Sequence, residues 1–153
     1  MKAIERLFWS IALPGFGQFL NKQYIKGITF ILLEFLVNTQ ANFNEIIRLS
    51  FLGKTQLALE VANYGWLMFY PCLYFFAMWD AFKDAGGGKK PFSFLPFVFS
   101  AYCVTVGLMV SPNAVFFGVT LGPVWFPMMC VVPGLLIGFL LQKLILSFST
   151  VEA

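Results

Sequence analysis

Glu34 is the residue whose type and position in this sequence most directly suggest chemistry. It interrupts an apolar run that extends from Gly27 to Gln40. A carboxylate inside such a run costs about 2.5–3.5 kcal/mol on membrane-insertion scales, and it usually faces a partner group or a water-filled cavity. Asn38 follows one helical turn later, on the same face of a helix. Two hypotheses follow: a relay for protons or cations, or a protonated acid that is hydrogen-bonded to a neighbouring helix.

Asp80 is the second acidic candidate, and it lies near the end of the apolar run from Tyr64 to Phe82. A contact with Lys22, with Lys26 or with the backbone amides of residues 14–17 would tie this run to the N-terminal part of the chain through charge-assisted hydrogen bonds. The alternative is that Asp80 and the bend at residues 14–17 form a ligand or ion site, as discontinuous helices do in transporters.

Catalytic and metal-binding groups are sparse in this chain. It has no histidine, and its three cysteines stand inside apolar runs without metal-ligand spacing. It also lacks a G-x-S-x-G motif and paired carboxylates at a useful spacing. The segment GGGKK, residues 86–90, lacks the pattern of a phosphate-binding loop and is typical of a flexible turn near anionic lipid. We therefore expect a non-enzymatic protein with no metal and no cofactor.

Composition indicates a membrane protein. Of 153 residues, 59% are hydrophobic and only 11% are charged, against roughly 25% charged in soluble domains. Mean hydropathy is +0.81. Ten lysines and arginines against seven acids give a net charge of +3, and these basic residues are dispersed. Nucleic acid is therefore not expected as a partner, whereas the lipid bilayer is.

Apolar runs of about 20 residues are long enough to cross a bilayer as helices. Four spans are expected, at residues 27–40, 64–82, 92–110 and 124–148. Pro71 should kink the second. Residues 7–20 are too short and break at Pro14, which predicts an interfacial or re-entrant helix. Residues 41–62 have the pattern of an amphipathic surface helix, and residues 114–123 should form a short re-entrant or interfacial piece.

The distribution of lysine and arginine favours cytoplasmic termini, because short cytoplasmic loops are rich in these residues. With four spans and both termini inside, the outer side holds only Arg48 and Lys54. The inner side holds eight basic residues: Lys2, Arg6, Lys22, Lys26, Lys83, Lys89, Lys90 and Lys143. The expected location is the cytoplasmic membrane.

Two stretches of the chain, LPGFGQFLNKQYIKG and AMWDAF, together resemble the TM2-domain-like small membrane proteins. The matching positions are Pro14, Gly15, Gly17, Gln18, Tyr24, Lys26, Gly27, Trp79 and Asp80. The resemblance covers roughly residues 7–85, although the link between the two helices is about 25 residues instead of a short turn, and the Asp-Arg-Phe signature is missing. It implies a helical hairpin of mostly unassigned function, of a kind found widely in bacteria.

The overall expectation is an all-α, polytopic helical membrane protein with about four transmembrane helices and short interfacial or re-entrant helices. Residues 1–153 should form one membrane domain, with a TM2-like hairpin in residues 1–85 and a second hairpin in residues 86–153. Gly134 and Gly138 form a G-x-x-x-G pattern that favours close helix packing, within the bundle or between protomers. The leading function is an accessory or assembly component that contacts other membrane proteins or its own copies. The alternative is a small transporter or channel subunit that uses Glu34.

Overall fold

The computed structural model describes residues 1–149, and most of these residues are helical. The α-helices within this range are α1 (Lys2–Ala12), α2 (Phe16–Leu20), α3 (Tyr24–Ala41), α4 (Phe43–Phe51), α5 (Thr55–Val61), α6 (Tyr64–Leu67), α7 (Phe69–Asp84), α8 (Leu95–Val110) and α9 (Gly122–Ser149). Between α8 and α9 lie a 3-10 turn, η1 (Ser111–Asn113), and two short strands, β1 (Val115–Phe116) and β2 (Val119–Thr120).

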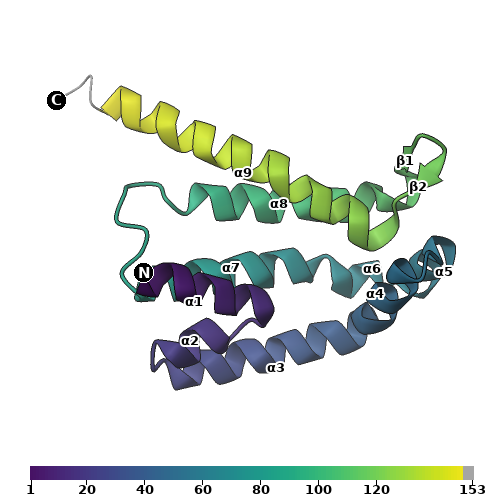
Figure 1. Cartoon of the computed structure of the whole chain (residues 1–153), viewed down its shortest axis with the longest axis horizontal. Helices are drawn as coiled ribbons and strands as arrows, with labels where there is room; N and C mark the ends of the chain where they lie inside the picture. Colours follow the sequence, from purple (N-terminus) through teal and green to yellow (C-terminus); the bar gives the residue numbers. More distant parts are fainter. Residues whose placement is uncertain (150–153) are drawn as a thin grey trace.

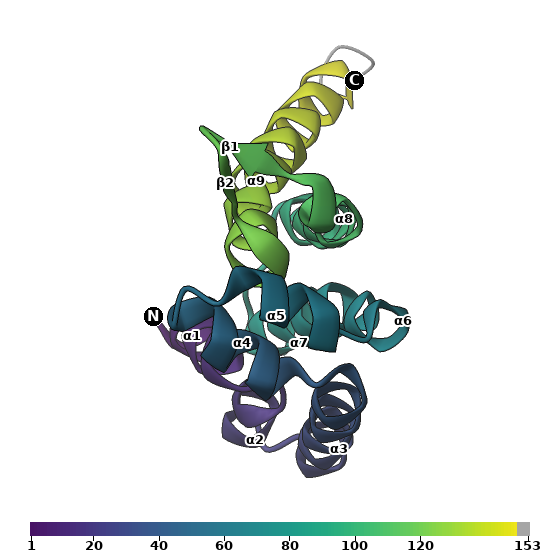
Figure 2. The ribbon, with the colours of Figure 1, turned by 90° about the vertical axis from the view of Figure 1, so that its right-hand side faces the viewer.

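The helices form two groups that lie side by side (Figure 1). Helices α8 and α9 run antiparallel to each other in one group, and α1, α2, α3 and α7 form the other. Helices α4 and α5 cross one end of the molecule and contact α9, at the near side in Figure 2. The first residues of the chain, the turn between α2 and α3 and the α7–α8 link all lie at the opposite end (Figure 1).

The break at the start of the chain separates α1 from α2. Pro14 has no N–H to donate to the carbonyl of Ser10, and Gly15 has a φ of 107°, which a glycine adopts without strain. Helix α1 packs along α7, and the chain then turns back through α2 to the end where it began (Figure 1). The break expected at Pro14 is therefore present.

Residues 41–62 form two short helices instead of the single surface helix that was expected. Helix α4 ends at Phe51, Gly53 follows with a φ of 71°, and α5 begins at Thr55. Ile46 and Ala58, one from each helix, are fully buried. This segment covers the end of the bundle because its apolar faces pack against α9 and the end of α3.

The predicted second span is divided at Met68, between α6 and α7. Pro71 accounts for the division, since a proline ring clashes with the carbonyl four residues earlier, here that of Leu67, and donates no hydrogen bond to it. The kink expected at Pro71 is therefore present as a break between α6 and α7, at Met68.

Strands β1 and β2 occupy part of residues 114–123, where a short re-entrant or interfacial piece was expected, and α9 already begins at Gly122. Val115 pairs with Thr120 and Phe116 with Val119 in an antiparallel ladder. The two residues between them, Phe117 and Gly118, have φ values of 50° and 81°. Positive φ at both loop positions is the requirement of a type I′ two-residue hairpin turn. The chain therefore forms a hairpin here, although its composition is apolar.

Two segments of the described chain are long and apolar enough to cross a membrane, Leu95–Asn113 and Gly122–Phe148. Helix α9 continues through Pro127 and Pro133 for 28 residues, which corresponds to about 42 Å. Helix α3 has 18 residues but carries Lys26 and Glu34, and α7 has only 16.

Candidate functional site

Glycines Gly15 and Gly17 bring α2 into close contact with its neighbours. A Cβ atom on Gly17 would lie 2.6 Å from the Cβ of Ala81 in α7 and 2.6 Å from the carbonyl oxygen of Arg6 in α1. A Cβ atom on Gly15 would lie 2.6 Å from the carbonyl oxygen of Gly27 in α3. Because these distances are too short for any side chain, the glycines of the motif let α2 wedge between α1, α3 and α7.

Five polar side chains then join the N-terminal helices to the end of α7, and we call them the clasp: Gln18, Asn21, Lys26, Asp80 and Asp84. Gln18 Nε2 donates to the carbonyl of Ala77 at 2.8 Å and to Asp80 Oδ2 at 3.0 Å. Asn21 Nδ2 donates to the carbonyl of Ala81 at 2.8 Å. The clasp thus satisfies backbone carbonyls of α7 as well as side chains.

Lys26 is the charged centre of the clasp. Its ammonium group lies 2.8 Å from Asp80 Oδ1 and 2.8 Å from Asp84 Oδ2. Two carboxylates thus accept hydrogen bonds from one ammonium group. The Asp80 side chain is 16% exposed, whereas Asp84 is 26% and Lys26 is 43% exposed. Of the two ion pairs that Lys26 forms, the one with Asp80 is therefore better shielded from solvent than the one with Asp84.

Three partners were expected for Asp80, and the structure shows contact with one of them, Lys26. The donation from Gln18, the bond from Asn21 and the second carboxylate at Asp84 were not predicted. The four-residue spacing between Asp80 and Asp84 was the available signal, because it places both carboxylates on one face of a helix. The bonds to α7 carbonyls left no signal in the sequence.

Glu34 lies against α7, in a second polar cluster. Tyr70 Oη donates to Glu34 Oε1 at 2.7 Å, and Asn38 Nδ2 donates to the same oxygen at 3.2 Å. Asn38 Nδ2 is also 3.3 Å from Asn44 Oδ1 at the start of α4. Glu34 and Asn38 therefore share one cluster, and Tyr70 is a member that sequence reasoning missed.

This cluster borders a cavity of about 640 Å³ that reaches the other helix group. Its walls come from the C-terminal end of α1, from α3, α4 and α7, and from parts of α8 and α9. Phe43, Tyr70 and Tyr74 line the same cavity as Glu34. The ring centroids of Phe43 and Tyr70 are 4.2 Å apart, and those of Tyr70 and Tyr74 are 5.4 Å apart. The cavity is mostly apolar with one acidic corner.

Glu34 differs from the acids of the clasp in its charge environment. Asp80 and Asp84 face Lys26, and Glu45 faces Arg48. Within residues 1–149, no lysine or arginine comes within salt-bridge distance of Glu34, and no basic residue lines its cavity. Its charge, when present, has no counter-ion in the described part of the chain.

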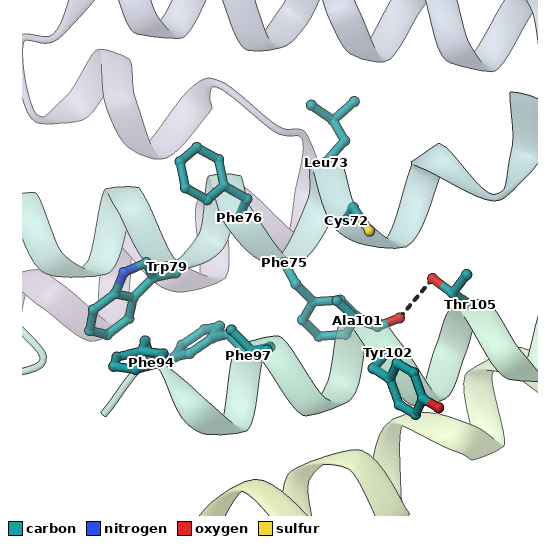
Figure 3. Close-up of a pocket in the computed structure, with 11 residues that line it drawn as sticks. Cys72, Leu73, Phe75, Phe76, Trp79, Phe94, Phe97, Ala101, Tyr102 and Thr105 are labelled. Atoms are coloured by element: carbon teal, nitrogen blue, oxygen red, sulfur yellow. Dashed lines mark hydrogen bonds between the residues drawn. The ribbon is translucent and has the colours of Figure 1, made fainter. Parts of the chain in front are cut away.

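A second cavity of about 620 Å³ lies between α7 and α8 (Figure 3). Aromatic side chains dominate its lining, among them Trp79 of the AMWDAF motif, which packs against Phe97 at 5.5 Å between ring centroids. The Thr105 hydroxyl donates to the carbonyl of Ala101 at 2.8 Å. No acidic or basic side chain among residues 1–149 lines this cavity, so Trp79 contributes packing between the two helix groups.

Gly134 and Gly138 face α8 of the same chain. A Cβ atom on Gly134 would lie 2.5 Å from Ser100 Cα, and one on Gly138 would collide with Pro96. Gly107 of α8 continues this close contact, since its Cβ would lie 2.7 Å from Cys130 Sγ. The packing of the G-x-x-x-G pattern is therefore internal, and Gly107 is a partner that sequence reasoning missed.

The remaining reactive groups form no further site in the part of the chain that the structure describes. Cys72, Cys103 and Cys130 are free thiols. No group of three or more His, Cys, Asp and Glu side chains within residues 1–149 is arranged to hold a metal ion. Comparisons of the chain with protein-family models, with curated proteins and with solved structures found no match.

Proposed function

We propose that this chain is a multi-pass protein of a bacterial cytoplasmic membrane, with four spans formed by α3, by α6 and α7 together, by α8 and by α9. The two apolar segments in α8 and α9 support this proposal. In residues 1–149 the basic side chains also separate along the bundle: Arg48 and Lys54 belong to the end with α4 and α5, and the other basic residues belong to the opposite end (Figure 1). Such an arrangement fits cytoplasmic termini.

In this orientation α1 and α2 form a re-entrant pair. Helix α1 enters beside α7, breaks at Pro14, and returns through α2 to the basic end. Tyr74 Oη donates to the carbonyl of Ile11 at 2.8 Å, which satisfies one of the free carbonyls at the end of α1. This is what non-helical backbone at membrane depth requires.

Within that membrane, the proposed role is a non-enzymatic accessory or assembly component. The clasp is the observation that carries this proposal, because the residues of the TM2-like motif tie helices of the chain together instead of facing a free ligand site. We propose the relationship to TM2-domain-like proteins on the same ground. The outer faces of α3 and α9 carry large exposed apolar side chains such as Phe35 and Phe139, which lipid or a second membrane protein would cover.

Purification of the intact protein in mild detergent tests the assembly role. Mass spectrometry should find another membrane protein at a fixed stoichiometry, and tagging that protein should recover this chain at the same ratio. Native mass spectrometry measures self-association in the same sample. A clean monomer in both experiments contradicts the assembly role.

A small transporter or channel subunit is the second candidate. The supporting observation is that Glu34 borders the cavity of about 640 Å³ and has no counter-ion among residues 1–149. Glu34→Gln keeps the shape of the side chain and an oxygen that accepts from Tyr70 and Asn38. It should abolish ion flux in liposomes, whereas Glu60→Gln, at an exposed acid of α5 outside the cavity, should leave it unchanged. Equal flux in both variants contradicts a role of Glu34 in transport.

A further inference from the structure

We infer that the cavity beside Glu34 binds a lipophilic organic cation, a molecule with one positive charge on an apolar body. This inference rests on the transport candidate for the choice of cavity. It states which class of ligand the cavity binds, and it makes no statement about transport. The reasoning starts from the unequal distribution of polar groups around the cavity. The acidic corner is formed by Glu34 and Asn38 of α3 with Tyr70 of α7, and apolar residues make most of the remaining wall.

The free oxygen of the carboxyl group is the first argument. Within residues 1–149, Glu34 accepts two hydrogen bonds, from Tyr70 and from Asn38, and both reach Oε1. These two bonds hold the carboxyl group in place and leave Oε2 for a ligand. A carboxylate positioned in this way lowers its own energy by acquiring a cation, and the described part of the chain supplies none.

The aromatic rings beside the carboxylate are the second argument. Phe43, Tyr70 and Tyr74 form a contiguous series, with ring centroids 4.2 Å and 5.4 Å apart. Aromatic faces attract ammonium and related cations through the ring quadrupole, most strongly where water is excluded. A hydrated metal ion gains little from such rings, and the three-residue clusters that hold metals do not occur within residues 1–149. The chemistry therefore favours an organic cation over an inorganic one.

The size and composition of the cavity are the third argument. A volume of about 640 Å³ falls within the range of about 300–1,000 Å³ that is typical of small-molecule sites. Phe51, Met78, Leu108 and Val131 line it away from Glu34 and would contact an apolar body. A proton alone would leave this space unexplained, and a neutral apolar molecule would leave the carboxylate without a partner.

Binding of radiolabelled tetraphenylphosphonium to the full chain in nanodiscs tests this inference. Saturable binding is expected, and Glu34→Gln should weaken it by about tenfold or more, since within residues 1–149 Glu34 is the only charged residue that lines the cavity. Glu60→Gln is the matched control and should bind as the unmodified protein does. Equal affinity in both variants, or the absence of saturable binding to the unmodified protein, overturns the inference.

Two further binding experiments use only the unmodified protein, so their outcome does not depend on whether the variants fold. Tetraphenylborate, which has the same shape and the opposite charge, should not bind saturably in separate samples, and equal binding of both ions overturns the inference. Discs of phosphatidylcholine and of phosphatidylethanolamine, two lipids without net charge, identify the source of the cation. Weaker tetraphenylphosphonium binding in phosphatidylcholine indicates that a choline headgroup competes for the cavity, and equal binding indicates a free organic cation.

The measurement also separates binding from transport. Saturable binding that depends on Glu34, together with an absence of flux in liposomes, removes the transport candidate and keeps this inference. Flux that depends on Glu34 without tetraphenylphosphonium binding keeps the transport candidate and removes the organic cation.

Discussion

The two helix groups of this molecule differ in the contacts that hold their own helices together. In the N-terminal group, long polar side chains cross between helices, and Lys26 with Asp80 and Asp84 forms the centre of the clasp. In the α8–α9 pair, glycines let the backbones approach, and no charged residue occurs between Pro91 and Gln142. Hydrogen bonds and ion pairs between side chains select a particular partner helix, because they require donors and acceptors in a fixed geometry. Packing between small residues depends only on the shapes of the two helix surfaces.

The glycine contact between α8 and α9 should respond most strongly to substitution. Gly134→Leu with Gly138→Leu would place side chains where Ser100 and Pro96 now lie. A side chain that is too large for a packed site destabilises a protein by about 1–3 kcal/mol. The melting temperature in detergent, measured by circular dichroism, should therefore fall markedly. Maleimide labelling of Cys103 and Cys130, which are both partly exposed, should become faster.

Val132→Leu adds bulk at an exposed position of the same helix and serves as the control. Its unfolding should match that of the unmodified protein. If the double glycine variant also unfolds normally, the α8–α9 pair is not held by close backbone contact, and the comparison between the two groups fails.

The clasp should show the next largest effect. Asp80→Ala removes the acceptor of Lys26 and Gln18, and hydrogen bonds to charged groups contribute about 1.5–3 kcal/mol each. Asp84→Ala removes a more exposed contact, for which about 1 kcal/mol or less is expected. Chemical unfolding of both variants measures the difference. Equal losses in the two variants would show that the shielding of Asp80 has no energetic consequence.

Glu34→Gln tests the same comparison in the N-terminal group, because Glu34 is a polar residue that has no ionic partner in the described part of the chain. The amide oxygen can still accept from Tyr70 and Asn38. The free energy of unfolding should therefore change by no more than about 1 kcal/mol, the scale of one neutral hydrogen bond. A loss as large as that of Asp80→Ala would make Glu34 one of the structural ties.

Glu45 in α4 should give the smallest effect. A hydrogen bond from Arg48 lowers the pKa of this exposed carboxyl below its ordinary value of 4.5. Its contribution to stability is present above that value and is lost as the pH falls through the lower folded pKa. Unfolding of the unmodified protein and of Glu45→Gln should differ slightly at about pH 7 and converge as the pH falls below 4.5 and through the lower folded pKa. A difference that grows on acidification would contradict this.

Local signals in the sequence predicted several features of the structure. Pro14 cannot donate to Ser10, and the chain breaks there. Gly134 and Gly138 are spaced for close packing, and both lie against α8. Each of these signals depends on a few neighbouring residues, so no knowledge of distant contacts was needed.

Features that depend on distant residues were missed. Gln18 bonds to Ala77, 59 residues later in the chain, and nothing near Gln18 identifies that carbonyl. Tyr70 stands in an apolar run where its hydroxyl had no evident partner, yet it donates to Glu34. The hairpin at residues 115–120 was missed because strands of two residues each are too short to show an alternating pattern, and its turn depends on positive φ at Phe117 and Gly118.

The long sequence separation within the clasp has a consequence for biosynthesis. Gln18 and Asp80 are 62 residues apart, and a ribosome adds about 5–20 residues per second. The N-terminal helices are therefore made roughly 3–12 seconds before their partner in α7 exists. During that interval the amides of Gln18 and Asn21 and the ammonium group of Lys26 need water or the insertion machinery as temporary partners. Helices α1 and α2 thus reach their final positions only after α7 has been synthesised.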